Sequence, residues 1–430
     1  MTQVRVVPVR FRILGFLLLL SFVNYLLRNN LSVALPSIRA EFDFTTAELG
    51  WILGSFNLAY ALFQLPGGVF GQALGPRRAL TILALSWGVL TALTGIAPSL
   101  MFASATGAMV ALMTVRFLLG AMNAPLFPVM AGAIANWFPV SGWAFPNASS
   151  SMALSLGQAS LGPIVTALII AFGWRASFYV LAPLGILAAI AWWIYGRDEP
   201  SQHRAVSPAE LALIRAGREP QPPPAPGAWR AVLVDRNVLL LASSYFCMNV
   251  VFYIFANWLF TYLVEERGFS LLESGVLYAL PFIVGAVLAV VGGLTCDALC
   301  RRIGPRWGCR AVGALGMGMV AWLLLAGAYA ANPYVAVALF SLCYGFTQFT
   351  EGAFWSGTTF VAGPYTAAAG GVLNTGGNLP GVLAPLFGLM VDRVGWLPTL
   401  TTGSLFALLS AILWLLIRVD IPARAPRQMT

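Results

Sequence analysis

Three charged side chains lie deep within long apolar segments, where a charge is costly if the segments cross a membrane. Arg28 lies about 17 residues into the first apolar segment, Arg116 lies in the fourth, and Glu351 lies in the middle of the tenth. A planar guanidinium can hold a carboxylate through two hydrogen bonds, whereas a buried carboxylate can bind and release a proton. These residues therefore indicate anion binding by the two arginines and proton coupling by Glu351.

Each of these residues also has a purely structural interpretation. The arginines could form interhelical salt bridges or backbone contacts that only shape the bundle, and Glu351 could pair permanently with an arginine. Fourteen of the fifteen acidic residues lie in loops or at segment ends, however, so two buried arginines face one buried carboxylate. At least one positive charge is therefore predicted to recognise an anion.

Polar side chains at the same depth extend this predicted site. Arg116 and Asn123 are seven residues apart, which places them on one face of a helix, and Tyr25 and Tyr60 add hydroxyl donors. Helix packing through amide hydrogen bonds is the alternative for these residues. The full set of substrate-binding candidates is Tyr25, Arg28, Tyr60, Arg116, Asn123, Asn249, Tyr253, Trp355, Asn374 and Asn378.

The elements that must position these residues are transmembrane helices. The chain has 430 residues, of which 59% are hydrophobic and only 9% are charged, whereas soluble domains carry about 25% charged residues. The apolar residues form long unbroken runs, not the short alternating stretches of a membrane β-barrel. The sequence therefore predicts an all-α integral membrane protein.

Twelve apolar runs are long enough to cross about 30 Å of hydrocarbon. They lie near residues 11–35, 46–70, 79–97, 104–135, 147–171, 176–196, 237–263, 271–296, 310–330, 334–361, 366–391 and 397–418. The single long polar segment, 197–236, is rich in proline and reads as a solvated cytoplasmic linker. The predicted domains are therefore an N-terminal six-helix half, 1–196, this linker, and a C-terminal six-helix half, 237–430.

The basic residues restrict the class of protein and predict its membrane topology. All of them are arginines, so the Gly-Lys pair of an ATP-binding P-loop and a Schiff-base lysine are both absent. Eighteen arginines fall in segments that are cytoplasmic if both termini are inside, and four fall in the opposite loops. This bias predicts cytoplasmic termini, with the bacterial inner membrane as the location, and it accounts for the net charge of +9 without nucleic acid.

No cofactor or metal is expected from the sequence. Five cysteines and one histidine are too few for a disulfide framework. Cys296, Cys300 and Cys309 gather near one cytoplasmic loop, but their spacing matches no common zinc pattern and no histidine lies near them. A membrane enzyme is also disfavoured, because no buried nucleophile with a histidine and no carboxylate pair occurs.

The two halves repeat each other in sequence. Gly67-Gly68 aligns with Gly292-Gly293 at an offset of 225 residues, each pair following the second helix of its half. Trp174 and Trp192 align with Trp396 and Trp414 at an offset of 222 residues. Parallel six-helix repeats with a substrate site near the membrane midplane are typical of major facilitator transporters.

Several motifs resemble the anion:cation symporter branch of the major facilitator superfamily. The resemblance covers residues 11–418 and is carried by the first-helix run from Asn24 to Pro36, then Arg116-Phe117, Trp137-Phe138-Pro139, Gly173-Trp174-Arg175, Thr261-Tyr262 and the run Asn374-Thr-Gly-Gly-Asn378. It implies a secondary transporter that moves a small organic anion, a sugar acid or carboxylate, by alternating access with a proton or sodium ion as co-ion. It also implies cytoplasmic gating loops at Gly68, Gln72, Arg77, Asp297 and Arg301.

The sequence departs from this branch at positions that usually carry carboxylates. Leu27 stands where an aspartate is common, Asn123 where a glutamate is common, and Gln72-Ala73 where the loop usually reads Asp-Arg. Ser141-Gly142 replaces a Glu-Arg pair at the end of the fifth helix. An uncoupled facilitator or exchanger, and a transport-silent sensor or scaffold of the same fold, therefore remain as alternatives.

Overall fold

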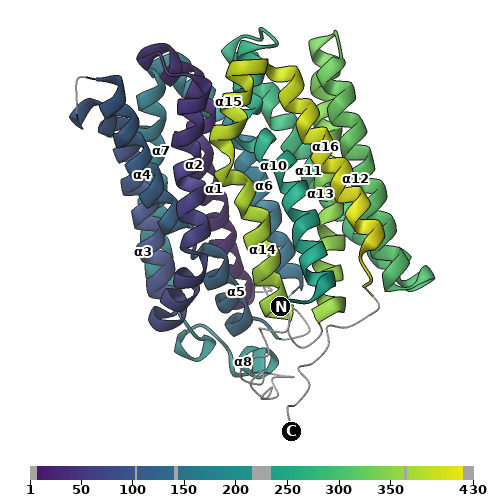
Figure 1. The fold of residues 1–430 in the computed structure, drawn as a ribbon. Coiled ribbons are helices and arrows are strands. Elements are labelled where there is room, and N and C mark those ends of the chain that lie inside the picture. Colours follow the sequence, from purple (N-terminus) through teal and green to yellow (C-terminus); the bar gives the residue numbers. More distant parts are fainter. Residues whose placement is uncertain (1–6, 102–103, 140–143, 216–233, 363–365, 420–430) are drawn as a thin grey trace, which may run out of the picture. The chain divides into compact units, whose positions relative to one another are not determined.

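The computed structural model describes residues 7–101, 104–139, 144–215, 234–362 and 366–419, and regular secondary structure in these ranges is helical (Figure 1). The helices of the first half of the chain are α1 (Val9–Phe42), α2 (Thr46–Leu62), α3 (Gln64–Met101), α4 (Ala105–Asn123), α5 (Leu126–Trp137), α6 (Ala144–Phe172) and α7 (Trp174–Tyr195). The short helix α8 (Pro208–Arg215) follows in the linker. The helices of the second half are α10 (Arg236–Glu265), α11 (Leu271–Ile303), α12 (Pro305–Tyr329), α13 (Pro333–Ala362), α14 (Thr366–Val382), α15 (Ala384–Val394) and α16 (Trp396–Leu416).

Each of the twelve predicted spans coincides with one helix or with consecutive helical segments. Nine helical stretches among the described residues are both long and apolar enough to cross a membrane. The predicted eleventh span is divided into α14 and α15 at Leu383, and the fourth is divided into α4 and α5 next to Pro125. The predicted all-α membrane fold is confirmed. The breaks within the fourth and eleventh spans are a further feature, which hydropathy does not reveal.

Two helices begin with the same local sequence and the same backbone conformation. Gly75 has a φ of 75° and interrupts α3 before Pro76, and Gly304 has a φ of 84° before Pro305 at the start of α12. Positive φ is costly for residues with a Cβ, and proline is favoured in the first turn of a helix because its missing N–H needs no partner there. A Gly-Pro pair therefore sets both chain reversals.

A second pair of helix starts also repeats. Gly173 has a φ of 82° before Trp174, and Gly395 has a φ of 83° before Trp396. These positions lie 222 residues apart, at the offset that aligned the tryptophans in the sequence. The turn that begins α7 therefore has the same backbone form as the turn that begins α16.

The chain divides into two compact units. Unit 1 comprises residues 1–34 and 58–221, and unit 2 comprises residues 35–57 and 222–430. The end of α1 and most of α2 therefore belong to the same unit as the helices from α10 onward. The predicted N-terminal half, 1–196, includes the end of α1 and all of α2. The division into the halves 1–196 and 237–430 stays a prediction.

Glycines allow close helix packing at matching places within each unit. In unit 1, a Cβ on Gly67 of α3 would lie 2.6 Å from Cγ of Pro125, and in unit 2 a Cβ on Gly292 of α11 would overlap the backbone of Phe349 on α13. Helix α3 also packs on α4 and α7, while α12 packs on α13 and α16 (Figure 1). The aligned glycine pairs thus mark the same kind of helix contact in both units.

Candidate functional site

Arg28 lies in the middle of α1 and is buried in unit 1. Its guanidinium carbon lies 4.5 Å from the ring centroid of Tyr60 and 5.3 Å from that of Tyr25. Both rings are themselves buried, and the face of an aromatic ring attracts a cation. The structure therefore brings three of the predicted binding residues together, with the tyrosines contacting the arginine through their rings.

Arg116 lies next to Arg28 in the same unit. Its Nη2 donates a hydrogen bond of 2.9 Å to the backbone carbonyl of Arg28, which fixes α4 against α1. Asn123, two turns further along α4, accepts a hydrogen bond from Asn24 and donates to the carbonyl of Leu119. Arg116 and Asn123 therefore both face α1, as their seven-residue spacing predicts.

The charged residues in the membrane part of unit 1 are all positive. Its sequence contains no aspartate or glutamate before Asp198, which lies beyond the last residue of α7. The membrane part of this unit therefore supplies positive charge and neutral donors but no carboxylate of its own. Such an arrangement favours a negatively charged ligand.

Glu351 lies on α13 in unit 2 and is held by two neutral donors. Its Oε1 accepts a hydrogen bond of 2.7 Å from the hydroxyl of Tyr245 and one of 2.9 Å from Nε1 of Trp355. Its Oε2 is buried and has no hydrogen-bond partner within the part of the chain that the structure describes. The carboxylate is therefore fixed through one oxygen, while the other is the atom where a proton would bind.

Helix α14 approaches α10 through the glycines of the Asn-Thr-Gly-Gly-Asn run. A Cβ on Gly377 would overlap the ring of Tyr245 and lie 3.0 Å from Nδ2 of Asn249. A Cβ on Gly381 would lie 2.8 Å from the ring of Tyr253. Because only a glycine allows this approach, these residues place the backbone of α14 directly on the polar face of α10.

The asparagines of α14 complete a second polar group in unit 2. Tyr253 donates a hydrogen bond of 3.0 Å to Oδ1 of Asn378, whose Nδ2 donates to the backbone carbonyl of Asn374. Asn249 donates to the carbonyl of Tyr245, four residues earlier on α10. The predicted binding residues of this unit therefore form two hydrogen-bonded groups. One contains Tyr253, Asn374 and Asn378, and in the other Asn249 bonds the carbonyl of Tyr245, whose hydroxyl bonds Glu351.

The predicted gating residue Arg77 makes several contacts within unit 1. Its guanidinium donates to the carbonyl of Trp193 and lies 4.3 Å from that ring centroid, while its backbone N–H donates to Oδ1 of Asp198 at 2.7 Å. A Cβ on Gly75 would lie 2.6 Å from the same carboxylate oxygen. Asp198 therefore caps the helix that restarts after Gly75, where a negative charge is favourable.

The other predicted gating residues are exposed or have open space around them. Gln72, Asp297 and Arg301 are exposed, and a Cβ on Gly68 would meet its nearest neighbour at 4.0 Å. Residues 141–142, where the sequence departs from the related branch, lie outside the described residues. The gating role of these positions stays a prediction.

Three residues of these clusters were not among the sequence candidates. Asn24 belongs to the first-helix motif, Tyr245 lies on the same helix as the candidates Asn249 and Tyr253, and Asp198 lies in the predicted linker. The polar stripe with a four-residue repeat, Tyr245, Asn249, Tyr253 and Asn257, is the signal that could have identified Tyr245. No comparable signal in the sequence connects Asn24 to Asn123 or Asp198 to Arg77.

Buried arginines in unit 1 and a buried carboxylate oxygen in unit 2, within apolar helices long enough to span a membrane, are typical of a membrane transporter. The major facilitator superfamily profile matches residues 17–385. The chain is 33% identical to a probable sulfoacetate transporter of Cupriavidus necator, with 97% of this chain and 96% of the relative covered. This chain belongs to the major facilitator superfamily, as the motifs indicated.

Other comparisons agree with this assignment. A probable galactarate/D-glucarate transporter of Bacillus subtilis is 28% identical over 90% of this chain and 87% of its own length. The crystal structure of a bacterial homolog of the human lysosomal transporter Spinster, in an inward-facing and occupied conformation, has a TM-score of 0.77. It covers 96% of this chain and 97% of its own at 18% identity, which supports the fold. The family and these relatives are transporters, not enzymes.

Proposed function

We propose that this protein carries a small organic anion across the membrane by alternating access, and that Arg28 recognises the anionic group. The observation that carries this proposal is the buried guanidinium of Arg28 between the rings of Tyr25 and Tyr60, beside Arg116, in a unit whose membrane part has no acidic residue. A charge-assisted hydrogen bond from a guanidinium to an oxyanion is stronger than a neutral one.

The relatives support a substrate with one or two acidic groups. Their names specify sulfoacetate, galactarate or D-glucarate, and hexuronate, which are all organic acids. Two adjacent arginines match the charge of a compact dianion, and the neutral amides nearby could donate to its remaining oxygens. Sulfoacetate is the first substrate to test, because its transporter shares the highest of these identities over nearly the whole chain.

Transport assays with reconstituted protein test this proposal. Proteoliposomes that contain unlabelled sulfoacetate should take up radiolabelled sulfoacetate by counterflow. Other organic acids that the protein transports should compete with this uptake. Arg28→Gln should weaken apparent affinity about tenfold or more, since hydrogen bonds to a charged group contribute about 1.5–3 kcal/mol. Arg28→Lys should also be impaired, because an ammonium cannot reproduce the guanidinium fork. Arg78→Gln, at an exposed arginine of the same unit, is the matched control.

The outcomes separate the competing functions. Unchanged affinity in folded Arg28→Gln would remove this residue from the site. Binding of an organic acid by thermal shift without any counterflow would instead support a sensor of the same fold. Counterflow without accumulation against a gradient would support the facilitator or exchanger.

We also propose that transport is coupled to protons through Glu351. The carboxylate is the one acidic side chain predicted near the membrane centre, and its Oε2 is buried with no partner among the described residues. Tyr245 and Trp355 both donate to Oε1, so they can hold the side chain in place whether or not Oε2 carries a proton. Sodium is the alternative co-ion, and an ion jump assay with imposed sodium or pH gradients distinguishes them.

The arginine distribution supports cytoplasmic termini in a bacterial inner membrane. Reporter fusions after residue 223 and at the C-terminus test this topology, and both should report cytoplasm. A periplasmic signal from either fusion would contradict the proposed topology.

A further inference from the structure

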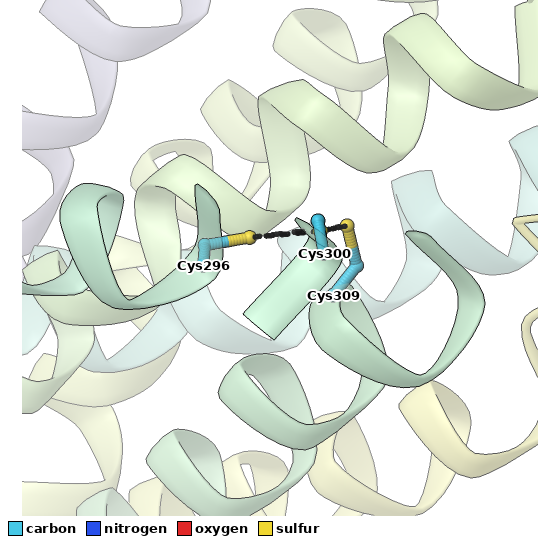
Figure 2. Close-up of side chains that lie close together, drawn as sticks. All are labelled: Cys296, Cys300 and Cys309. Atoms are coloured by element: carbon cyan, nitrogen blue, oxygen red, sulfur yellow. Dashed lines mark hydrogen bonds between the residues drawn. The ribbon is translucent and has the colours of Figure 1, made fainter. Parts of the chain in front are cut away.

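Three thiols converge where α11 ends and α12 begins in unit 2 (Figure 2). The Sγ atoms of Cys296 and Cys300 lie 3.9 Å apart, those of Cys296 and Cys309 also 3.9 Å, and those of Cys300 and Cys309 3.6 Å. Cys296 and Cys309 are buried, whereas Cys300 is half-buried. The three sulfurs therefore form one compact triangle with one corner open to the surroundings.

The fold of the loop, not the sequence spacing, creates this triangle. Cys296 and Cys300 are one helical turn apart and lie on the same face of α11. The chain then reverses at Gly304, and Gly308 lies so close to α11 that a Cβ there would be 2.5 Å from the backbone nitrogen of Cys300. This close approach places Cys309 opposite the other two cysteines.

We propose that Cys296, Cys300 and Cys309 bind a thiophilic cation, with Zn²⁺ as its occupant and a water as fourth ligand. A Zn–S bond of about 2.3 Å requires an S···S edge of about 3.8 Å in a tetrahedron. The three observed separations of 3.6–3.9 Å bracket this edge. The triangle of sulfurs is thus one face of a tetrahedron that needs little rearrangement to receive the ion.

The surrounding charge suits a thiolate site. Zinc binding releases the thiol protons, so three thiolates and one Zn²⁺ carry a net charge of −1. Arg301, Arg302, Arg306 and Arg310 occur in the same stretch of chain together with one acidic residue, Asp297, so the local sequence has a net positive charge. The bound ion would connect the end of α11 to the first turn of α12 and stabilise this reversal of the chain.

Metal titration of the purified full-length protein tests the site. Protein kept reduced and stripped of metal in detergent should bind one Zn²⁺ per chain in competition with a metal buffer. Cd²⁺ as a spectroscopic probe should produce the ultraviolet charge-transfer band of cadmium thiolates, with the intensity of three Cd–S bonds. Thermal unfolding should shift upward with added Zn²⁺, because an ion that binds only the folded state stabilises it.

Cysteine variants assign the ligands. Cys300→Ser changes the half-buried corner and should lower Zn²⁺ affinity at least tenfold and reduce the cadmium band by about a third. Cys309→Ser should have the same effect if it folds, and Cys300→Ser keeps the test decisive if it does not. Cys247→Ala and Cys343→Ala, at buried cysteines away from the triangle, are the matched controls and should bind as the parent does.

Three results would overturn the proposal. Absence of both the cadmium band and Zn²⁺ binding in the parent protein would exclude a thiophilic site. Equal Zn²⁺ affinity in Cys300→Ser would place the ion elsewhere. Binding of Cu⁺ without any binding of Zn²⁺ would contradict the assignment of the occupant, since thiolates are also good ligands for Cu⁺.

Discussion

The guanidinium carbon of Arg28 lies 4.5 Å from the ring centroid of Tyr60, so the buried cation of α1 rests on an aromatic face from α2. Tyr25, three residues before Arg28, contributes a second ring at 5.3 Å. The hydrogen-bonding groups of the arginine are not consumed by a ring contact of this kind. The tyrosines can therefore hold the side chain in position while its N–H groups bind an anion.

The first prediction separates the ring of Tyr60 from its hydroxyl group. Tyr60→Phe keeps the aromatic face and should leave apparent substrate affinity within about threefold of the parent. Tyr60→Leu removes a cation–π contact of about 0.5–2 kcal/mol, so affinity should fall about two- to thirtyfold. Counterflow measurements over a range of substrate concentrations give both values. A larger loss in the phenylalanine variant would show that the hydroxyl contacts the substrate, as the sequence predicts.

The second prediction concerns the glycine pair of α11. Gly292→Ala places a methyl group against the backbone of Phe349 and should destabilise the protein by about 1–3 kcal/mol. Gly293→Ala is the matched control, because nothing lies within 4 Å of a Cβ at that position and alanine favours a helix. Thermal unfolding in detergent compares the two variants. Equal midpoints would show that α11 and α13 are not in tight contact at Gly292.

Much of the helical architecture and the depth of the charged residues could be predicted from sequence. Apolar length fixes where helices cross the membrane, and the cost of a buried charge identifies Arg28, Arg116 and Glu351 without knowledge of their neighbours. The repeated Gly67-Gly68 and Gly292-Gly293 pairs also have a physical basis, since in each pair the first glycine makes the tight contact.

The partners of these residues could not be predicted. Tyr245 and Glu351 are separated by 106 residues, and Asn24 and Asn123 by 99, so helix packing decides which side chains meet. The convergence of the three cysteines could not be predicted from the sequence either. Their spacing resembles no zinc motif, because the reversal at Gly304 and the close approach at Gly308, not a regular interval, bring Cys309 to the others.

The third prediction concerns the segment of α1 and α2 that belongs to unit 2. Asp392 on α15 accepts hydrogen bonds from the backbone N–H groups of Thr46 and Ala47 in the first turn of α2, and Arg39 pairs with Glu265 at 2.7 Å. A carboxylate at a helix N-terminus satisfies unpaired donors and interacts favourably with the helix dipole. Asp392 therefore anchors this end of α2 within unit 2.

Asp392→Ala should accelerate hydrogen exchange at the start of α2. Loss of a cap costs about 0.5–2 kcal/mol, which corresponds to about two- to thirtyfold faster exchange where opening is local. Mass spectrometry of peptides that cover residues 44–50 provides the measurement. Asp297→Ala, at an exposed carboxylate of α11, should leave those peptides unchanged. Unaltered exchange in Asp392→Ala would mean that the capping bonds contribute nothing to this anchor.

The fourth prediction concerns the only histidine. Burial lowers the pKa of His203, the positive charges of Arg197 and Arg12 lower it further, and Glu210 opposes them. Its Nδ1 accepts a hydrogen bond from the backbone N–H of Ala205, which also favours the neutral ring. In protein labelled with carbon-13 at histidine, the one ring signal should therefore titrate below about 6.5, the value of an unperturbed histidine.

The lowered pKa of His203 determines how the stability of the folded protein changes with pH. As the pH falls through about 6.5, the unfolded chain takes up a proton before the folded chain does, so this contribution to stability is present at neutral pH and decreases on acidification. Arg197→Gln should move the titration upward, whereas Arg204→Gln, which is not among the causes of the shift, should not. A midpoint above that of a free histidine would contradict the placement of these charges.

The last prediction concerns Glu351 and the driving force of transport. Glu351→Gln keeps the size of the side chain and an oxygen that can accept the hydrogen bonds of Tyr245 and Trp355, but it removes the exchangeable charge. If the carboxylate carries the coupling proton, this variant should exchange labelled substrate for unlabelled substrate across liposomes. It should fail, however, to accumulate substrate when only a pH gradient is imposed.

Tyr245→Phe provides the matched test of the neighbouring hydroxyl. It removes one donor to Oε1 but leaves the carboxylate, so accumulation should persist with a changed pH dependence. Intact pH-driven accumulation in Glu351→Gln would exclude this residue as the coupling site. Loss of folded protein in Glu351→Gln, with normal folding of Tyr245→Phe, would instead indicate that the negative charge itself stabilises the bundle, as a permanent ion pair with an arginine would require.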